Sequence, residues 1–251
     1  MHKLNSPDGK RLLSLVREGD YAHAGEIEAI EGLLKLIDPP SPRSWLDAGC
    51  GRGGTAAYIQ RKCGVAMTAF DIDEVSLDEA RLHYPQIRFL GSDVAQIAHT
   101  LSDSFDVISC FNSFYAFPNQ PQALAGLARL AHDQTQLLIF EYTASDQFKT
   151  SGFAHLPETS HWKPVVPDTF PRELDRQGWR LEQSVNLDAE YARWYAELVT
   201  KFNRRKTLLV GTCGKEIYEY ALCFYSSLLS AIESGQIGGA LFKARKKRAG
   251  D

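Results

Sequence analysis

The chain has 251 residues, of which 44% are hydrophobic and 24% charged, and its formal net charge is −3 at pH 7. This length fits one α/β domain with an elaboration, and the composition is that of an ordinary globular protein. The sequence contains no apolar run of the about 18 residues that a membrane span needs, and residues 1–10 lack the apolar stretch of a secretory signal. We therefore expect a cytoplasmic protein with no membrane partner.

The distribution of charge and cysteine excludes two further classes. The body of the chain carries no basic stripe of the kind that phosphate backbones require, and we interpret the basic run at 243–248 as a solvated tail, so no nucleic-acid partner is expected. The cysteines form neither a C-x-x-C pair nor a metal-ligand spacing with histidine, which argues against a disulfide framework and against a metal site. They are Cys50, Cys63, Cys110, Cys213 and Cys223.

In chain order, short apolar runs alternate with helical patterns up to residue 144, which is typical of a parallel sheet covered by helices on both faces. The first helix ends at the proline-rich segment 38–42, and it carries Ile27, Ile30, Leu34 and Ile37. The expected strands are 44–47, 67–70, 87–90, 105–111 and 137–142. The helices between them are expected at 54–61, at 121–131, and at a segment ending near Pro85 that Ser76 and Glu79 open as a capping box.

Beyond residue 144 the pattern changes. Residues 145–167 are irregular and contain three prolines, and loops of this length in a compact domain are often active-site lids. Asp168 is expected to cap a short helix that ends at Gln177, and 179–187 reads as a sixth strand. Two amphipathic helices, 188–210 and 214–234, precede a last strand at 237–244.

The most informative segment is the glycine-rich turn that follows the first strand. Gly49, Gly51 and Gly54 satisfy G-x-G-x-x-G, in which glycine lets the backbone approach a ligand closely, but this pattern does not decide between cofactors. Asp47 lies two residues earlier, where it would repel a dinucleotide phosphate and attract a ligand with an ammonium and a sulfonium group. The structural alternative is that Asp47 only caps the turn.

Further carboxylates follow the next strands. Asp71 lies at about the interval of 20 residues at which Rossmann-like sites bind the ribose hydroxyls, and Ile72 beside it would lie against the adenine. Asp93, after the third strand, is placed to accept a hydrogen bond from the adenine amine, although alone it would pass for a turn aspartate. After the fourth strand, residues 111–115 supply backbone and an aromatic edge at the switch point of the sheet.

This ordered set resembles the class I S-adenosylmethionine-dependent methyltransferases. The matching residues are D-A-G-C-G-R-G at 47–53, F-D-I-D at 70–73, S-D-V at 92–94 and F-D-V-I-S-C-F-N-S-F at 105–114. The resemblance implies a Rossmann-like α/β fold with a seven-stranded, mostly parallel sheet whose last strand is antiparallel. It also implies cofactor binding through Tyr21, Asp47, Gly49, Gly51, Asp71, Ile72, Asp93, Val94 and Phe111.

The rest of the chain looks similar to small-molecule methyltransferases of the glycine, sarcosine and dimethylglycine type, through residues 21–26 and the two helices before 235–240. Nucleic-acid adenine methyltransferases carry D/N-P-P-Y/F after the fourth strand, whereas this chain has N-S-F-Y at 112–115. The implied organisation is an N-terminal helical cap at 1–40, a cofactor-binding core at 41–144, and a remainder at 145–251 with the lid and two cap helices at 188–234.

On the substrate side, phenol and indole groups on the two late helices are candidate pocket walls for an amine, although such stripes are more often packing. They are Tyr191, Trp194, Tyr195 and Tyr218. The candidate catalytic residues are His23, Glu141, Tyr191 and Tyr195. The alternatives are that His23 only caps a helix, that Glu141 is a solvated strand end, and that His155 and His161 in the lid are idle.

The sequence thus predicts an enzyme that transfers a methyl group from S-adenosylmethionine to a small nucleophile, most simply an amine. One alternative in the same fold is a nicotinamide-dependent oxidoreductase, which Asp47 and the missing hydride-transfer constellation disfavour. Another is a catalytically silent protein that binds the cofactor.

Overall fold

The computed structural model describes residue 4 and residues 6–146 and 148–248, and it contains one seven-stranded sheet. The strand order is β3-β2-β1-β4-β5-β7-β6, and β7 runs antiparallel to both of its neighbours while the other pairs are parallel. The strands are β1 (Ser44–Ala48), β2 (Ala66–Asp71), β3 (Arg88–Gly91), β4 (Phe105–Phe111), β5 (Ala131–Ala144), β6 (Trp179–Asn186) and β7 (Ile237–Lys246). The predicted seven-stranded sheet with an antiparallel last strand is confirmed.

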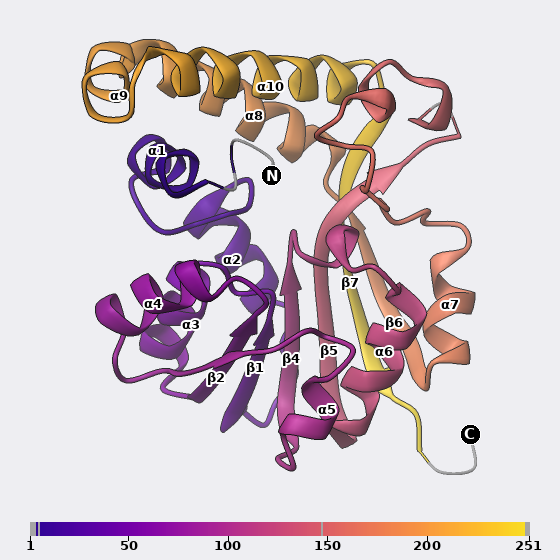
Figure 1. The fold of residues 1–251 in the computed structure, drawn as a ribbon. Coiled ribbons are helices and arrows are strands. Elements are labelled where there is room, and N and C mark those ends of the chain that lie inside the picture. The colour runs from indigo at the N-terminus through magenta and orange to yellow at the C-terminus, as the bar shows by residue number, and fades with distance from the viewer. Residues whose placement is uncertain (1–3, 5, 147, 249–251) are drawn as a thin grey trace.

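Helices cover both faces of this sheet (Figure 1). On one face lie α2 (Glu26–Leu34), α3 (Gly54–Cys63) and α4 (Glu74–His83), and on the other lie α5 (Ile97–Thr100), α6 (Gln120–Arg129) and α7 (Phe170–Arg176). Successive strand residues belong to opposite cores, as Trp45 and Leu46 do, because side chains alternate across a strand. Both faces are therefore apolar, which explains the almost wholly apolar strand sequences.

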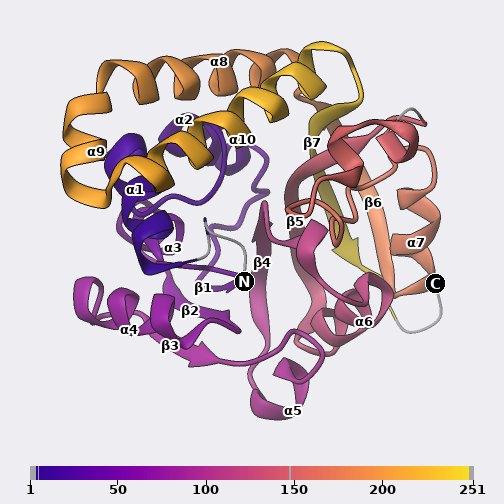
Figure 2. The ribbon, with the colours of Figure 1, turned by 45° about the horizontal axis from the view of Figure 1, so that its top comes forward.

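Four more helices form a layer above the carboxyl ends of the parallel strands. They are α1 (Pro7–Arg17), α8 (Asp188–Arg204), α9 (Lys206–Cys213) and α10 (Lys215–Glu233). α10 packs along α8 and α9, and α1 contacts all three, so a helix near the start of the chain joins three helices from its last third in this layer (Figures 1 and 2). Ser6 caps α1 by accepting a hydrogen bond from the Gly9 N–H, with Pro7 at the start of the helix.

Several predicted element boundaries are wrong. α4 begins at Glu74 after Asp73, so Ser76 lies inside the helix and the predicted capping box does not form. The residue that precedes α7 is Thr169 rather than Asp168. The predicted helix 188–210 breaks at Arg205, whose guanidinium donates to the Leu15 carbonyl at the end of α1. That contact joins segments far apart in sequence, which explains why no glycine or proline marks the break.

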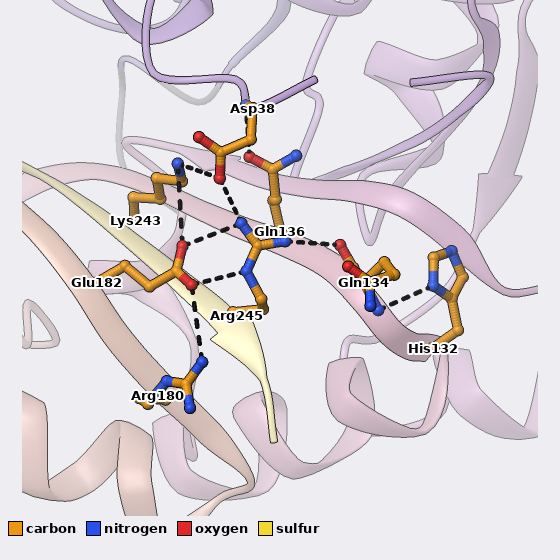
Figure 3. Close-up of polar contacts among 8 residues, drawn as sticks. All are labelled: Asp38, His132, Gln134, Gln136, Arg180, Glu182, Lys243 and Arg245. Atoms are coloured by element: carbon orange, nitrogen blue, oxygen red, sulfur yellow. Dashed lines mark hydrogen bonds and ion pairs between the residues drawn. The ribbon is translucent and has the colours of Figure 1, made fainter. Parts of the chain in front are cut away.

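Near the amino ends of the parallel strands, a network of charged side chains connects the segment before β1 to β6 and β7 (Figure 3). Asp38 accepts hydrogen bonds from Lys243, at 2.6 Å, and from Arg245, and its N–H donates to the Gln136 side chain at 3.0 Å. Glu182 pairs with Arg245 at 2.6 Å on the other side. The Lys243 side chain is only 7% exposed, so its ammonium depends on these carboxylates in place of water.

We expect Asp38→Ala to lower the free energy of unfolding by on the order of 1–2 kcal/mol, because a nearly buried ammonium loses its nearest carboxylate. Asp103→Ala is the control: its pair with Arg88 is about half exposed on both sides and should contribute less than about 1 kcal/mol. Urea unfolding of the two variants measures the difference. Equal losses would contradict a special role for the Asp38 network.

Candidate functional site

A cavity of about 610 Å³ opens at the carboxyl ends of β1, β2, β3 and β4. The order of the sheet reverses between β1 and β4, and this switch point is where open α/β sheets bind ligands. The helix α1 contributes Lys10, Leu13 and Ser14 to the lining, and His161 from the segment 145–167 also lines the cavity. The volume is in the range of cofactor and substrate sites in general.

The glycine-rich turn after β1 forms the floor of the cavity. The N–H groups of Gly49 and Cys50 both donate to the Phe70 carbonyl at the end of β2, at 2.8 and 3.0 Å. Gly49 has a φ of +79°, and a Cβ there would lie 2.5 Å from the Cβ of Ser113. Only glycine fits this position, because the turn is held tightly between β2 and the segment after β4.

Carboxylates line the next wall of the cavity. Asp71 accepts hydrogen bonds from the N–H of Gly51, at 2.8 Å, and from the N–H of Asp73, at 3.0 Å. Burial raises the pKa of Asp71 above its usual value. Lys10 of α1 pairs with Asp73 and donates to the Ser76 hydroxyl at 2.8 Å. The end of β2 therefore presents fixed acceptors to the cavity, with α1 directly above them.

The third strand adds the remaining acceptor. Asp93 uses one carboxylate oxygen to accept from the Ala95 N–H at 2.8 Å, as in an aspartate turn. Seven of the nine residues that the sequence assigned to cofactor binding line this one cavity. They are Tyr21, Gly49, Gly51, Asp71, Ile72, Asp93 and Val94. Ile72 is 71% exposed at the cavity, so its apolar side chain is open to a ligand there.

The other two assigned residues, Asp47 and Phe111, do not line the cavity. Asp47 is 2% exposed and accepts a hydrogen bond from the Ser109 hydroxyl at 2.9 Å, so its carboxylate faces β4 and neither caps the turn nor reaches the cavity. Phe111 packs beside Phe140 in the core. The neighbouring Asn112, Ser113 and Tyr115 provide the lining on this side.

Burial raises the pKa of Asp47 to about 7, against an ordinary value of 3.8. A raised pKa means that the folded state holds a proton which the unfolded state has already released. We therefore expect the cofactor-free protein to lose stability as pH rises from about 4 to about 7 through this group. Asp47→Asn should flatten that part of the curve, and urea midpoints measured across the range test it. An unchanged slope would contradict the assignment.

His23 is 1% exposed and does not line the cavity. One ring nitrogen lies 3.0 Å from its neighbour's carbonyl and the other 2.9 Å from the Thr55 hydroxyl in α3. Burial lowers the pKa of His23 to about 4, which keeps the imidazole neutral at pH 7. Both ring nitrogens of His23 therefore have hydrogen-bond partners, and the side chain connects the N-terminal segment to α3. It neither caps a helix nor lies at the cavity surface.

The other catalytic candidates are also buried behind the cavity wall. Glu141 is fully buried, so the alternative of a solvated strand end is wrong. Tyr191 donates to the Asn112 side chain at 3.3 Å, and the Tyr195 hydroxyl pairs with that of Tyr142. These phenols and Trp194 pack between α8 and β5, whereas Tyr218 packs against Phe202 between two helices, and none of the four lines the cavity.

Two lining groups could not be found from sequence patterns. Lys10 reaches the cavity from α1, and Asp20 accepts from Arg52 at 2.7 Å and from the Tyr84 hydroxyl at 3.1 Å. Both act across long sequence separations and carry no local motif. Among the described residues, no group of His, Cys, Asp and Glu side chains could hold a metal ion. No helix in the described part of the chain is long and apolar enough to cross a membrane.

Comparison with known proteins gives a consistent result. A family model described as "Methyltransferase domain" matches residues 21–184, more than half of the chain. The methyltransferase GfsG of Streptomyces halstedii is 31% identical over 207 residues, which cover 78% of this chain and 72% of that protein. A glycine/sarcosine/dimethylglycine N-methyltransferase of Actinopolyspora halophila is 21% identical over 90% of this chain, which spans 41% of that protein.

Solved structures show the same fold at low identity. Phosphoethanolamine N-methyltransferase 2 of Haemonchus contortus, in complex with S-adenosyl-L-methionine, has a TM-score of 0.85 and 15% identity, covering 98% of this chain and 59% of that chain. The cyclopropane synthase MmaA2 of Mycobacterium tuberculosis has a TM-score of 0.82 and 16% identity, covering 98% and 96%. These structures support the arrangement of the sheet and its helices.

Proposed function

Because this chain belongs to the family of S-adenosylmethionine-dependent methyltransferases, we propose that its cavity binds this cofactor and a small-molecule acceptor, which is an amine. The observation that carries the proposal is the convergence of the glycine turn, Asp71 and Asp93 on one cavity at the switch point of the sheet. Membership in this family decides against the alternative of a nicotinamide-dependent oxidoreductase.

The residues present fit the proposed cofactor. Asp71 and Asp93 offer carboxylate oxygens suited to ribose hydroxyls and to the adenine amine, and the exposed face of Ile72 suits the adenine ring. Gly51 leaves open space, since a Cβ there would meet no atom within 4 Å. We assign the direct contacts to the seven lining residues, while Asp47 and Phe111 support the turn and β4 from behind.

When bound, the cofactor supplies a methyl group on a sulfonium, whose sulfur is already a good leaving group. What the protein adds is mainly alignment of acceptor, methyl and sulfur, together with exclusion of water. Asn112 and Tyr115 follow β4, which lies across β1 from the strands that precede Asp71 and Asp93, and we assign the acceptor to the β4 side of the cavity. A neutral amine carries its own lone pair, which this site has only to bind deprotonated and aligned.

This proposal needs no strong general base. General-base help contributes about 10²–10⁴-fold in enzymes that depend on it. We expect single replacements of four candidates each to lower kcat by less than the upper end of that range, measured at saturating cofactor. They are His23, Glu141, His155 and His161. A loss of about 10⁴-fold from one histidine, with cofactor binding intact, would instead indicate a dedicated base and a hydroxyl or carbon nucleophile.

The proposed function is tested by incubating the protein with S-adenosylmethionine and a set of small amines, including glycine and sarcosine, and measuring release of S-adenosylhomocysteine. The expected result is release above the level without protein for at least one amine. Calorimetry with S-adenosylhomocysteine provides the binding measurement. Binding without release from any acceptor, including a metabolite extract, would support the catalytically silent alternative, and tight NADH binding would contradict the cofactor assignment.

A further inference from the structure

The backbone separates from the sheet at the end of β4, beside a buried carboxylate. β4 and β5 pair as far as Phe111 and Phe140, and the Asn112 N–H still donates to the Phe140 carbonyl at 2.8 Å. Glu141 is the first residue of β5 beyond this pairing. On its other side β5 continues to pair with β7, so Glu141 itself stays fixed in the sheet.

In the turn that follows β4, the backbone no longer pairs with β5. There the carboxyl group of Glu141 accepts hydrogen bonds from the turn instead. One oxygen accepts from the Tyr115 N–H at 3.0 Å, and the other accepts from the Tyr142 N–H at 2.8 Å and from the Asn112 side-chain amide at 3.3 Å. Glu141 is fully buried, where unpaired N–H groups would each cost on the order of 1–3 kcal/mol. Burial raises the pKa of Glu141 to about 8, whereas hydrogen bonds from the three donors oppose this rise and favour the ionised form, so the donors and the carboxyl group hold one another in a fixed geometry.

The turn that this carboxylate holds has an unusual backbone conformation. Asn112 has a φ of +44°, in the left-handed region, which asparagine adopts more readily than most other residues with a side chain. The Tyr191 hydroxyl donates to the Asn112 side-chain oxygen at 3.3 Å, so both ends of its amide are bound. Contacts from β5, from the Glu141 carboxyl group and from Tyr191 thus hold this conformation from several directions.

We propose that Glu141 is a positioning residue for methyl transfer, which holds the Asn112–Tyr115 turn as the acceptor-side wall of the cavity. This inference rests on the proposed function. Asn112, Ser113 and Tyr115 all line the cavity, whereas Glu141 does not. Glu141 thus acts through the turn, and neither takes a proton from the acceptor nor binds its amine directly. Misplacing a wall by about 1 Å can cost about 10²-fold in rate.

Glu141→Gln is the informative variant because it keeps the shape of the side chain. The glutamine amide has one acceptor oxygen, which can replace only one of the two carboxyl oxygens of Glu141. Its NH₂ group would then face an N–H donor that has lost its acceptor. We expect kcat/KM for the acceptor to fall about 10- to 100-fold while the Kd for S-adenosylhomocysteine changes less than about 3-fold. Unchanged kcat/KM would overturn the proposal, and so would a parallel loss of cofactor affinity.

A second measurement reports on the turn without any turnover. In Glu141→Gln, hydrogen exchange at the Tyr115 amide should rise at least about 10-fold, while the Asn112 amide, bonded to a backbone carbonyl, stays protected. Exchange unchanged at both amides would overturn the proposal. Since this readout needs no acceptor, it stands even if the wild type fails to release S-adenosylhomocysteine and the proposed function is wrong.

A matched control lies at the other end of β4. Asp106 also accepts from two backbone N–H groups, those of Arg43 and Ser44, at 2.7 and 3.0 Å, but far from the cavity. Asp106→Asn should leave acceptor kcat/KM unchanged, even where it lowers stability. Should Glu141→Gln fail to fold, Tyr191→Phe removes the other contact to the Asn112 side chain and should lower acceptor kcat/KM by about 3- to 10-fold. No effect of that variant would contradict the proposal.

Discussion

Replacing Asp71 with alanine is expected to weaken binding of S-adenosylhomocysteine by about 10- to 150-fold. This factor corresponds to a charge-assisted hydrogen bond of about 1.5–3 kcal/mol between the carboxylate and a ribose hydroxyl. Burial raises the pKa of Asp71, and in Asp71→Ala the ribose hydroxyl would lose the acceptor that this side chain provides in the cavity wall. Calorimetry on the folded variant measures the effect.

The control has to separate the ligand contact from support of the loop, because Asp71 also accepts from the Gly51 and Asp73 N–H groups. Asp71→Asn keeps the size of the side chain and one acceptor oxygen, so its affinity should lie between those of the wild type and Asp71→Ala. Asp78→Ala, on the exposed side of α4, should leave the affinity unchanged. Unchanged affinity in Asp71→Ala would contradict the proposed cofactor site.

The parts of the site that the sequence predicted are those held by local chain geometry. The glycine turn, Asp71 and Asp93 each follow a strand directly, and the ends of parallel strands meet at one edge of the sheet. Asp47 belonged to the same motif, but it lies one residue before the end of β1, and in a strand one residue decides which way a side chain points. The motif therefore predicted the loop, whereas the structure places this carboxylate behind the loop and outside the cavity lining.

Other parts depend on contacts between distant segments, which no local pattern records. Lys10 reaches Asp73 from a helix that only tertiary packing places above β2, and the break at Arg205 depends on the end of α1. The tyrosines of α8 illustrate a different limit. Their spacing predicts a buried face, and aromatic side chains fill a core as readily as they line a pocket, so the pattern did not place Tyr191 and Tyr195 behind the cavity wall.

Gly51→Ala should weaken cofactor binding by about 5- to 150-fold, because the new methyl group projects into the floor of the proposed cofactor site. Overpacking by one methyl in a filled site costs typically about 1–3 kcal/mol. Gly51 has a φ of +53° and a Cβ there meets no protein atom within 4 Å, so the protein alone has room for alanine. Any loss of cofactor affinity that exceeds the effect of backbone strain must then come from contact between the new methyl group and the ligand.

Gly64→Ala isolates that backbone strain. Gly64 also has a positive φ, +68°, and a Cβ there likewise meets no atom within 4 Å, but it caps the far end of α3, away from the cavity. Both variants should lose about 1–2 kcal/mol of folding stability from the left-handed conformation. Only Gly51→Ala should also lose affinity for S-adenosylhomocysteine. Equal affinities would mean that the ligand does not approach this turn, and the cofactor would have to lie elsewhere in the cavity.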